Sequence, residues 1–323
     1  MTTRRTVLFC AAAFAAGGSA AAQAPDRWPT RPVRVIVPYP PGGTADLGAR
    51  LFFASVSTRL GRPFVIENRG GATGTIGAAA VVQAAPDGYT VLYDATGLSV
   101  TPALFPRLPY DPVRDLVPVF RSVVVPQLVL VNPSSPAQDL AGLIALAKRT
   151  QGGLNAGSAG NGSMQHLVLE RFARAAGVTL NHVPYRGGAP ALNDLVSGQL
   201  QLYFGNVNVS APFVRAGSLR ALAHTGRDRL TALPGLPPLS DALPGFETYE
   251  WNGVFVPRNT PQAVVDTLNA ALNAALAEPE LAEKLRAADL QAAPNTPADF
   301  AAFFREQSTT WQGFVREAGI RPE

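Results

Sequence analysis

The residue whose surroundings first suggest chemistry is Ser158, which lies among glycines and alanines. Its segment, Ala156-Gly157-Ser158-Ala159-Gly160, differs at one position from Gly-x-Ser-x-Gly, the strand-to-helix turn that presents the nucleophile of many serine hydrolases. Asp194 and His224 follow in the chain order that such a triad needs. However, a second glycine-serine pair follows at once and makes the segment wider than a sharp turn, and His166 falls within a predicted helix. A secreted serine hydrolase is therefore kept as the alternative to a binding loop.

Three glycine-bearing loops, each between a predicted strand and a predicted helix, suggest a site for an anion. Val37-Pro38-Tyr39 leads into Gly42-Gly43, Val183-Pro184-Tyr185 leads into Gly187-Gly188, and the loop 157–163 adds hydroxyl groups. The first N–H groups of a helix have no intrahelical partner, and the helix dipole adds partial positive charge there. One such loop can serve backbone geometry alone. Three of them at the carboxyl ends of strands predict binding of a small anion such as a carboxylate between two lobes.

The sequence gives no sign of a cofactor or a metal. Gly71-x-x-Gly74-x-x-Gly77 is not the dinucleotide pattern Gly-x-Gly-x-x-Gly, and the chain has no Walker A motif. His166, His182 and His224 are far apart in the sequence and have no carboxylate at ligand spacing. We therefore expect neither a cofactor nor a bound metal.

Strand and helix patterns alternate along the chain, which is typical of α/β domains with parallel sheets. An apolar run at 123–131 is broken by Pro126. Strands are predicted at 33–37, 64–67, 89–93, 154–156, 180–183, 200–204, 219–223 and 253–256, and helices at 45–60, 76–85, 139–149, 164–176, 191–197, 261–277, 279–288 and 297–318.

Composition fits a folded protein with two lobes. The 323 residues are 47% hydrophobic, and a chain of this length usually forms more than one core. The net charge is +4, Lys148 and Lys284 are the only lysines, and no basic run is present. These features argue against a nucleic-acid partner.

The first 22 residues have the features of an export signal. Arg4 and Arg5 precede the apolar stretch 6–16, and small residues at 20–22 suit a signal peptidase that cuts after Ala22. The pair of arginines also allows a twin-arginine signal, so both export routes stay open. The one cysteine, Cys10, lies inside this segment, which leaves the mature chain without a thiol or a disulfide. We expect a periplasmic protein.

A series of short motifs extends along the chain after the predicted signal. They lie at 38–46 with Ala49-Arg50, 65–71, 85–90, 110–112, 157–163 with His166-Leu167, 183–187, Asp194-Leu195 and Gly198-Gln199. Together they resemble the Bug family of periplasmic solute receptors, which are the substrate-binding components of tripartite tricarboxylate transporters.

The resemblance implies the fold, the activity and the partners. The fold would be a two-lobed periplasmic-binding-protein fold of type II, a Venus flytrap with two hinge-crossing segments. The protein would bind a small organic acid between the lobes and deliver it, as a monomer, to a two-component membrane permease, without catalysing a reaction. The ligand class stays open among dicarboxylates, amino acids, aromatic acids and nicotinate-like compounds.

The family's cleft maps onto four loops of this chain. Asp46 would accept a hydrogen bond from a water or from a ligand amino group, or it would serve only as a helix cap. Arg186 would hold a distal carboxylate, or it would be an exposed loop arginine. The expected ligand-binding residues are Pro41, Gly42, Gly43, Asp46, Thr96, Ser99, Ser158, Asn161, Gly162, Ser163, His166, Tyr185, Arg186, Gly187 and Asn206.

The chain departs from the family pattern at two expected walls of the cleft. Family members often carry an acidic residue where Gly205 stands, and a histidine in the loop that Leu98-Ser99 fills here. Both positions touch the expected cleft, so the resemblance does not specify the ligand.

The resemblance and the order of elements also suggest the lobe boundaries. After the signal at 1–22, residues 23–124 and 250–323 would form the first lobe and residues 125–249 the second. The two hinge segments would be 123–129 and 249–255, because each joins one sheet to the next set of elements.

Overall fold

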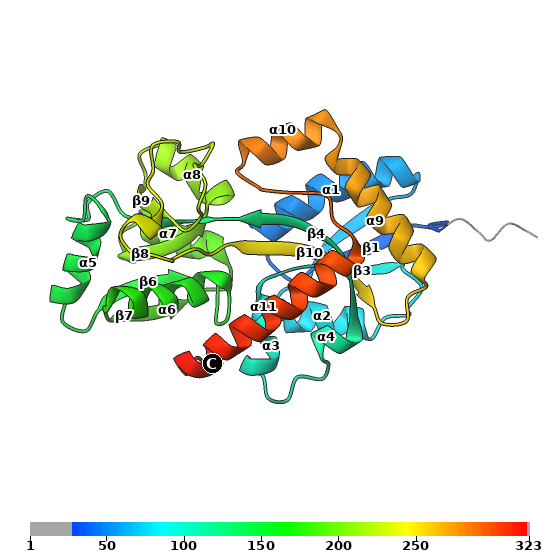
Figure 1. Cartoon of the computed structure of the whole chain (residues 1–323), viewed down its shortest axis with the longest axis horizontal. Helices are drawn as coiled ribbons and strands as arrows, with labels where there is room; N and C mark the ends of the chain where they lie inside the picture. Colours follow the sequence, from blue (N-terminus) through cyan, green and yellow to red (C-terminus); the bar gives the residue numbers. More distant parts are fainter. Residues whose placement is uncertain (1–27, 322–323) are drawn as a thin grey trace, which may run out of the picture.

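Two five-stranded sheets, each covered by helices, form the two lobes of the computed structural model (Figure 1). The structure describes residues 28–321, so the predicted export signal and Cys10 lie outside the described residues. The strand orders are β2-β1-β3-β10-β4 and β7-β6-β8-β5-β9. The predicted two-lobed α/β architecture is confirmed.

The first lobe is built on a mixed sheet. Strand β1 pairs in parallel with β2 and β3, and β10 is antiparallel to β3 and β4. Helices cover both faces, so β1 is almost wholly apolar and buried, as parallel strands require. The strands are β1 Val33–Val37, β2 Phe64–Asn68, β3 Thr90–Ala95, β4 Leu116–Val125 and β10 Glu250–Pro257. The helices are α1 Thr44–Leu60, α2 Thr75–Val82, α3 Gly97–Leu104, α4 Pro112–Asp115, α9 Gln262–Leu276, α10 Pro279–Ala287 and α11 Pro297–Ala318, with the short 3₁₀ helix η1 Ala72–Gly74.

The second lobe repeats the plan. Strand β6 is parallel to β7 and β8, and β5 is antiparallel to β8 and β9. The strands are β5 Gln127–Val131, β6 Leu154–Ser158, β7 Leu180–Pro184, β8 Leu202–Asn206 and β9 Arg220–His224. The helices are α5 Leu140–Arg149, α6 Met164–Ala176, α7 Gly188–Val196 and α8 Val207–Arg215, with the 3₁₀ helix η2 Leu239–Asp241.

Two strand connections link the lobes. Strand β4 ends in the first sheet, and after Pro126 the chain continues as β5 in the second sheet. Proline has no N–H to donate to a ladder, which suits the point where the chain changes sheets. The chain returns through Tyr249 into β10. Both crossings fall within the expected hinge segments, although hinge motion itself stays a prediction.

Helix α11 makes a third link between the lobes. Its later residues Trp311 and Val315 belong to the same buried cluster as Leu167 and Phe172 of α6. An Arg174 Nη2 atom donates to the carbonyl oxygen of Glu317 at 2.9 Å. Figure 1 shows this end of α11 reaching beneath α6. The last turns of the chain therefore pack on the second lobe, although α11 starts on the first.

Two helices next to the site have no counterpart among the predicted elements. Helix α3 contains Pro102, and α8 contains Pro212. Proline in a helix interior removes a hydrogen bond and costs about 3 kcal/mol, so both segments look like loops in the sequence. The two helices are stabilised by packing against the rest of the protein rather than by the helix propensity of their own residues. Among the described helices, none has the length and the apolar character needed to cross a bilayer.

Candidate functional site

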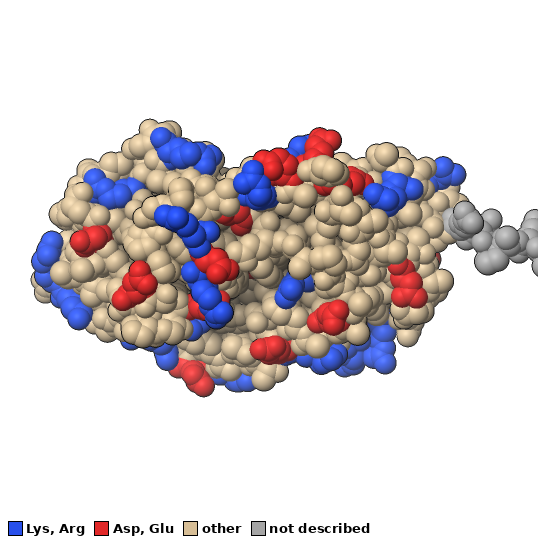
Figure 2. Space-filling model, turned by 45° about the horizontal axis from the view of Figure 1, so that its top comes forward, with Lys and Arg blue, Asp and Glu red and all other residues tan. Residues whose placement is uncertain are grey.

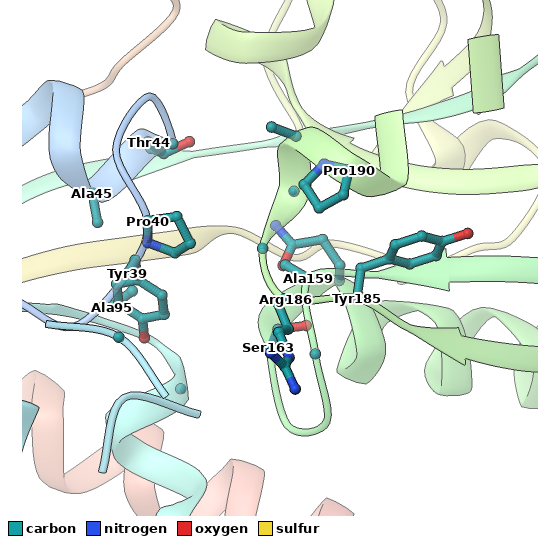
Figure 3. A pocket seen from close by; sticks show the side chains of 18 of the residues that line it. Tyr39, Pro40, Thr44, Ala45, Ala95, Ala159, Ser163, Tyr185, Arg186 and Pro190 are labelled. Atoms are coloured by element: carbon teal, nitrogen blue, oxygen red, sulfur yellow. The ribbon is translucent and has the colours of Figure 1, made fainter. Parts of the chain in front are cut away.

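A cavity of about 960 Å³ lies between the two lobes. Figure 2 shows it as a hollow with acidic and basic side chains along its rim. In Figure 3, Tyr39, Pro40 and Thr44 of the first lobe lie across this space from Arg186 and Pro190 of the second. The loops after β1, β3, β6 and β7 converge there, as expected for the carboxyl ends of strands in an α/β sheet.

The structure brings most of the expected site residues to the cavity wall. They come from both lobes and include the only cation that lines the cavity among the described residues, the exposed Arg186. The predicted residues that line the cavity are Pro41, Gly42, Gly43, Asn161, Ser163, Tyr185, Arg186, Gly187 and Asn206. The predicted residues that lie behind the wall are Asp46, Thr96, Ser99, Ser158, Gly162 and His166.

Asp46 shapes the loop that precedes α1. Its Oδ2 atom accepts hydrogen bonds from the Gly42 N–H and from Arg50 Nε, both at 3.0 Å, and its Oδ1 atom accepts one from Asn68 Nδ2 at 2.9 Å. Burial acts to raise the pKa of Asp46, but these hydrogen bonds outweigh it and lower the pKa. The side chain is 3% exposed. Both oxygens are therefore engaged within the first lobe, where they fix the backbone of Gly42.

Thr96 and Ser99 tie the start of α3 to the sheet. The Thr96 Oγ1 atom accepts a hydrogen bond from the Trp251 N–H at 3.0 Å, and Ser99 Oγ donates to the Thr96 carbonyl at 2.6 Å. Both residues are fully buried. In this stretch Ala95 and Gly97 line the cavity instead.

Ser158 and His166 support the loop that follows β6. Ser158 Oγ lies 2.6 Å from His182 Nε2, and the His182 ring stacks on the His166 ring with centroids 3.7 Å apart. The Gly162 N–H donates to His166 Nδ1 at 3.2 Å. Burial, helped by the neighbouring His166, lowers the pKa of His182 to about 4, so its ring is neutral near pH 7.

The triad considered for a hydrolase is not assembled. Ser158 is fully buried, and Asp194 accepts a hydrogen bond from the Tyr185 hydroxyl at 2.7 Å. His224 lies on β9, which is separated from β6 by β8 and β5. A nucleophile needs its base within hydrogen-bond reach and access to the substrate. Ser158 has neither Asp194 nor His224 as a partner and no access to the cavity.

A buried acid at the start of β10, Glu250, is not among the expected site residues. It lines the cavity, and its Oε2 atom accepts hydrogen bonds from Gln165 Nε2 at 3.0 Å and from Asn206 Nδ2 at 2.9 Å. Burial raises the pKa of Glu250, and the two amide hydrogen bonds offset only part of that rise. The one available signal was a charged residue that directly precedes an apolar strand between the lobes.

Tyr39 and Asp94 form a second polar pair at the cavity wall. The Tyr39 hydroxyl donates to Asp94 Oδ1 at 3.0 Å. Asp94 is 1% exposed, and burial raises its pKa to about 7. Tyr39 lines the cavity, whereas Asp94 lies behind it.

Among the described α-helices, four have an N-cap residue that lines the cavity and no side-chain cap. These N-cap residues are Gly43 for α1, Gly74 for α2, Gly187 for α7 and Asn206 for α8. Helix α6 also begins at the cavity, but the Ser163 side chain caps it. The first N–H groups of α1 and α7 therefore remain available to a ligand, with the positive end of each dipole beside them. The Val207 N–H that opens α8 donates to the Pro126 carbonyl at 3.1 Å. The Thr75 N–H that opens α2 donates to the Ala72 carbonyl.

The lobes touch each other around the cavity. The Thr73 hydroxyl donates to the Asn161 carbonyl at 2.6 Å, and the Thr44 hydroxyl donates to Asn208 Oδ1 at 3.0 Å. Asn206 Nδ2 in turn donates to Thr44 Oγ1 at 2.8 Å. Each of these bonds joins the first lobe to the second, so the structure shows the lobes closed on each other.

Within residues 28–321, no group of three or more histidine, cysteine or acidic side chains could hold a metal ion.

The sequence model of the "tripartite tricarboxylate transporter family receptor" matches residues 49–320. The chain belongs to this family of solute receptors.

Solved structures of the family are similar to this receptor over nearly its whole length. A Rhodopseudomonas palustris protein solved with adipate is 36% identical with a TM-score of 0.86, covering 92% of this chain and 100% of that one. The periplasmic binding protein BugD is 32% identical with a TM-score of 0.85, covering 92% and 100%. MatC from Rhodopseudomonas palustris, solved with malate, is 33% identical with a TM-score of 0.82, covering 89% and 100%.

These findings confirm the resemblance to the Bug family and the two-lobed periplasmic-binding-protein fold. The family and its solved members are solute-binding proteins of the periplasmic type. The receptor is therefore not an enzyme, and nothing among the relatives favours the serine hydrolase.

Proposed function

We propose that this receptor binds a small organic carboxylate between its lobes, in the periplasm, and delivers it to a two-component permease of the tripartite tricarboxylate type. The observation that supports the ligand class most directly is the pair of uncapped helix starts with free N–H groups at the cavity, α1 on one lobe and α7 on the other. Two related structures hold adipate and malate, both of which are carboxylates.

The ligand carboxylate would lie at the first turn of α1. The N–H groups of Thr44 and Ala45 have no acceptor within the helix, and both residues line the cavity. Hydrogen bonds to a charged acceptor are worth about 1.5–3 kcal/mol each, so a few amides can hold a carboxylate without a cation. Arg186, on the opposite wall, is available for a second acidic group.

Closure of the lobes would couple binding to recognition by the permease. A ligand that contacts both lobes binds the closed form better than the open form and so shifts the population toward closure. We propose that the receptor acts as a monomer, because the cavity is built entirely from one chain.

The function is tested on the purified mature chain with a panel of mono- and dicarboxylic acids. A bound acid raises the melting temperature by mass action, and we expect at least one acid of the panel to do so while it is recovered unchanged. The acid that gives the largest shift is then used to measure affinities of variants by calorimetry.

Two substitutions of Thr44 separate its amide from its hydroxyl. Thr44→Pro removes the N–H at the first helical position, where proline is tolerated, and Gly43 already has the extended backbone that precedes a proline. Thr44→Ala removes only the hydroxyl. We expect Thr44→Pro to bind the acid about tenfold more weakly than Thr44→Ala. Equal affinities of the two variants would show that α1 does not hold the carboxylate, and no shift with any acid would reject the function.

A further inference from the structure

One end of the cavity presents hydrogen-bond acceptors around Glu250. The Oε2 atom of Glu250 accepts hydrogen bonds from Gln165 Nε2 and Asn206 Nδ2. Because this oxygen accepts both hydrogen bonds, both amides turn their nitrogen atoms toward it. The orientation of the two amide groups is thus set by the acid.

The same geometry uses the amide hydrogens completely. Asn206 Nδ2 donates to Glu250 and to Thr44 Oγ1, and Gln165 Nε2 donates to Glu250 and to Asn206 Oδ1 at 3.2 Å. An amide nitrogen carries two hydrogens, so neither has one left for a ligand. Among the described residues, none donates to Glu250 Oε1 or to Gln165 Oε1, and both residues line the cavity. This end of the cavity therefore offers acceptors to a ligand.

The acceptor group lies next to the proposed carboxylate site. Asn206 Nδ2 donates one hydrogen bond to the hydroxyl of Thr44, the first residue of α1, and another to Glu250 Oε2. Free helix N–H groups and a free carboxylate oxygen are therefore separated by only two hydrogen bonds. A ligand that suits both must carry an anionic acceptor and a cationic donor close together. A plain dicarboxylate that filled the same space would have to place an oxygen beside Gln165 Oε1, an acceptor that has no hydrogen to donate to it.

We infer that the receptor selects amino-carboxylates, whose carboxylate binds the start of α1 while their protonated amine donates to Glu250 Oε1 and Gln165 Oε1. The inference rests on the proposed function and assigns the ligand class of the same site. It also moves the role of amine acceptor, considered for Asp46, to Glu250, because both oxygens of Asp46 are already engaged.

The test compares ligands that differ only in the amine. Alanine and propionate, glutamate and glutarate, and 2-aminoadipate and adipate share their carbon skeletons pair by pair. Calorimetry on the mature receptor gives the ratio of affinities within each pair. We expect the amino form of the best-bound pair to bind about tenfold or more tightly than its partner, as a hydrogen bond between charged groups implies.

Glu250→Gln keeps the shape of the side chain and removes the charge, so we expect it to reduce that ratio about tenfold or more. The matched control is Glu247→Gln. Glu247 lies three residues earlier, pairs with Arg227 at 2.7 Å and does not line the cavity, so the ratio should stay at its wild-type value.

The outcomes separate the inference from the proposed function. If the wild-type receptor binds the amine-free acids as tightly as the amino acids, or if Glu250→Gln leaves the ratio unchanged, the inference is wrong while the receptor still binds carboxylates. If no member of any pair binds, the proposed function fails as well. Should Glu250→Gln not fold, the wild-type ratio alone decides the question.

Discussion

Asp94 shows how burial at the cavity wall changes the chemistry of a single residue. Its carboxylate accepts hydrogen bonds from the Ala95 N–H and the Tyr39 hydroxyl, yet burial dominates and raises its pKa to about 7. An unfolded aspartate has a pKa of about 3.9. Between these two values the folded chain holds a proton that the unfolded chain has lost. Stability from this group is therefore lost as the pH rises toward 7.

Asp94→Asn removes this dependence on pH, because an amide oxygen can keep both hydrogen bonds without a charge. At pH 8 we expect the variant to melt at a higher temperature than the wild-type receptor, whereas at pH 4 the two should melt together. In the wild-type receptor, Asp94 lowers the free energy of unfolding by at most about 1.4 kcal/mol for each pH unit of increase between the two pKa values. Thermal melts at the two pH values measure the difference. An equal difference in melting temperature between the variant and the wild-type receptor at pH 4 and at pH 8 would show that Asp94 is not protonated in the folded state at low pH.

Single residues also show where local sequence patterns mislead. Ser158 has the neighbours of a nucleophile, but its hydroxyl pairs with His182, a residue on the adjacent strand β7. Asp46 has the position of a helix-start acid, and the structure uses it to hold Gly42. In both cases the partner that decides the role is brought there by folding.

At the scale of elements, strand β10 and helix α11 depend on a glycine. A Cβ atom on Gly253 would overlap the ring of Phe300 on α11, and the two elements pack through Trp251, Phe300 and Phe304. Strand β10 also carries Glu250, so the close approach at Gly253 fixes the strand that positions the cavity's buried acid.

We expect Gly253→Ala to lower the free energy of unfolding by about 1–3 kcal/mol, because the added methyl forces the Phe300 ring or the strand to move. The matched control is Gly313→Ala on α11, where an added Cβ has no atom within 4 Å. Alanine is the better helix former by about 0.8–1.0 kcal/mol, so the control should be unchanged or stabilised. Urea unfolding measures both variants. Equal destabilisation of the two would mean that the contact with Phe300 is not the cause.

Most elements followed from local patterns, because a strand or helix with one apolar face shows it in its own sequence. Helices α6 and α11 were predicted with the bounds that the structure shows. The helices α3 and α8 could not be predicted because each contains a proline and is stabilised by what packs on it. Both follow strands that end at the cavity, so two elements that shape the site were absent from the prediction. The four-residue helix α4, away from the cavity, was absent as well.

For the whole molecule, contacts across the cavity balance the open and closed forms. Thr73 donates to the Asn161 carbonyl of the other lobe, and α11 holds both lobes at its far end. A bond made only in the closed form stabilises that form by its own free energy, about 1 kcal/mol for a neutral hydrogen bond.

Thr73→Ala removes this bond, and Thr73→Ser keeps the hydroxyl. We expect Thr73→Ala to shift the ligand-free receptor toward the open form and to weaken binding of the best carboxylate about fivefold, with Thr73→Ser close to the wild-type value. Small-angle scattering should give a larger radius of gyration for Thr73→Ala without ligand, and the same radius as the wild-type receptor at saturating ligand. An unchanged radius together with unchanged affinity would show that this contact does not bias closure.

The alternation of strands and helices could be predicted from the amino-acid sequence, as could the glycine loops at the strand ends and the resemblance to a family of solute receptors. These properties depend on residues that are neighbours in the chain. Which side chains face the cavity depended on contacts between distant parts of the chain. Gln165 and Glu250 are 85 residues apart, and Thr44 and Asn206 are 162 apart, yet they form one hydrogen-bonded group at the cavity. No local sequence pattern predicts such a group, because its members come from different lobes and lie together only in the folded protein.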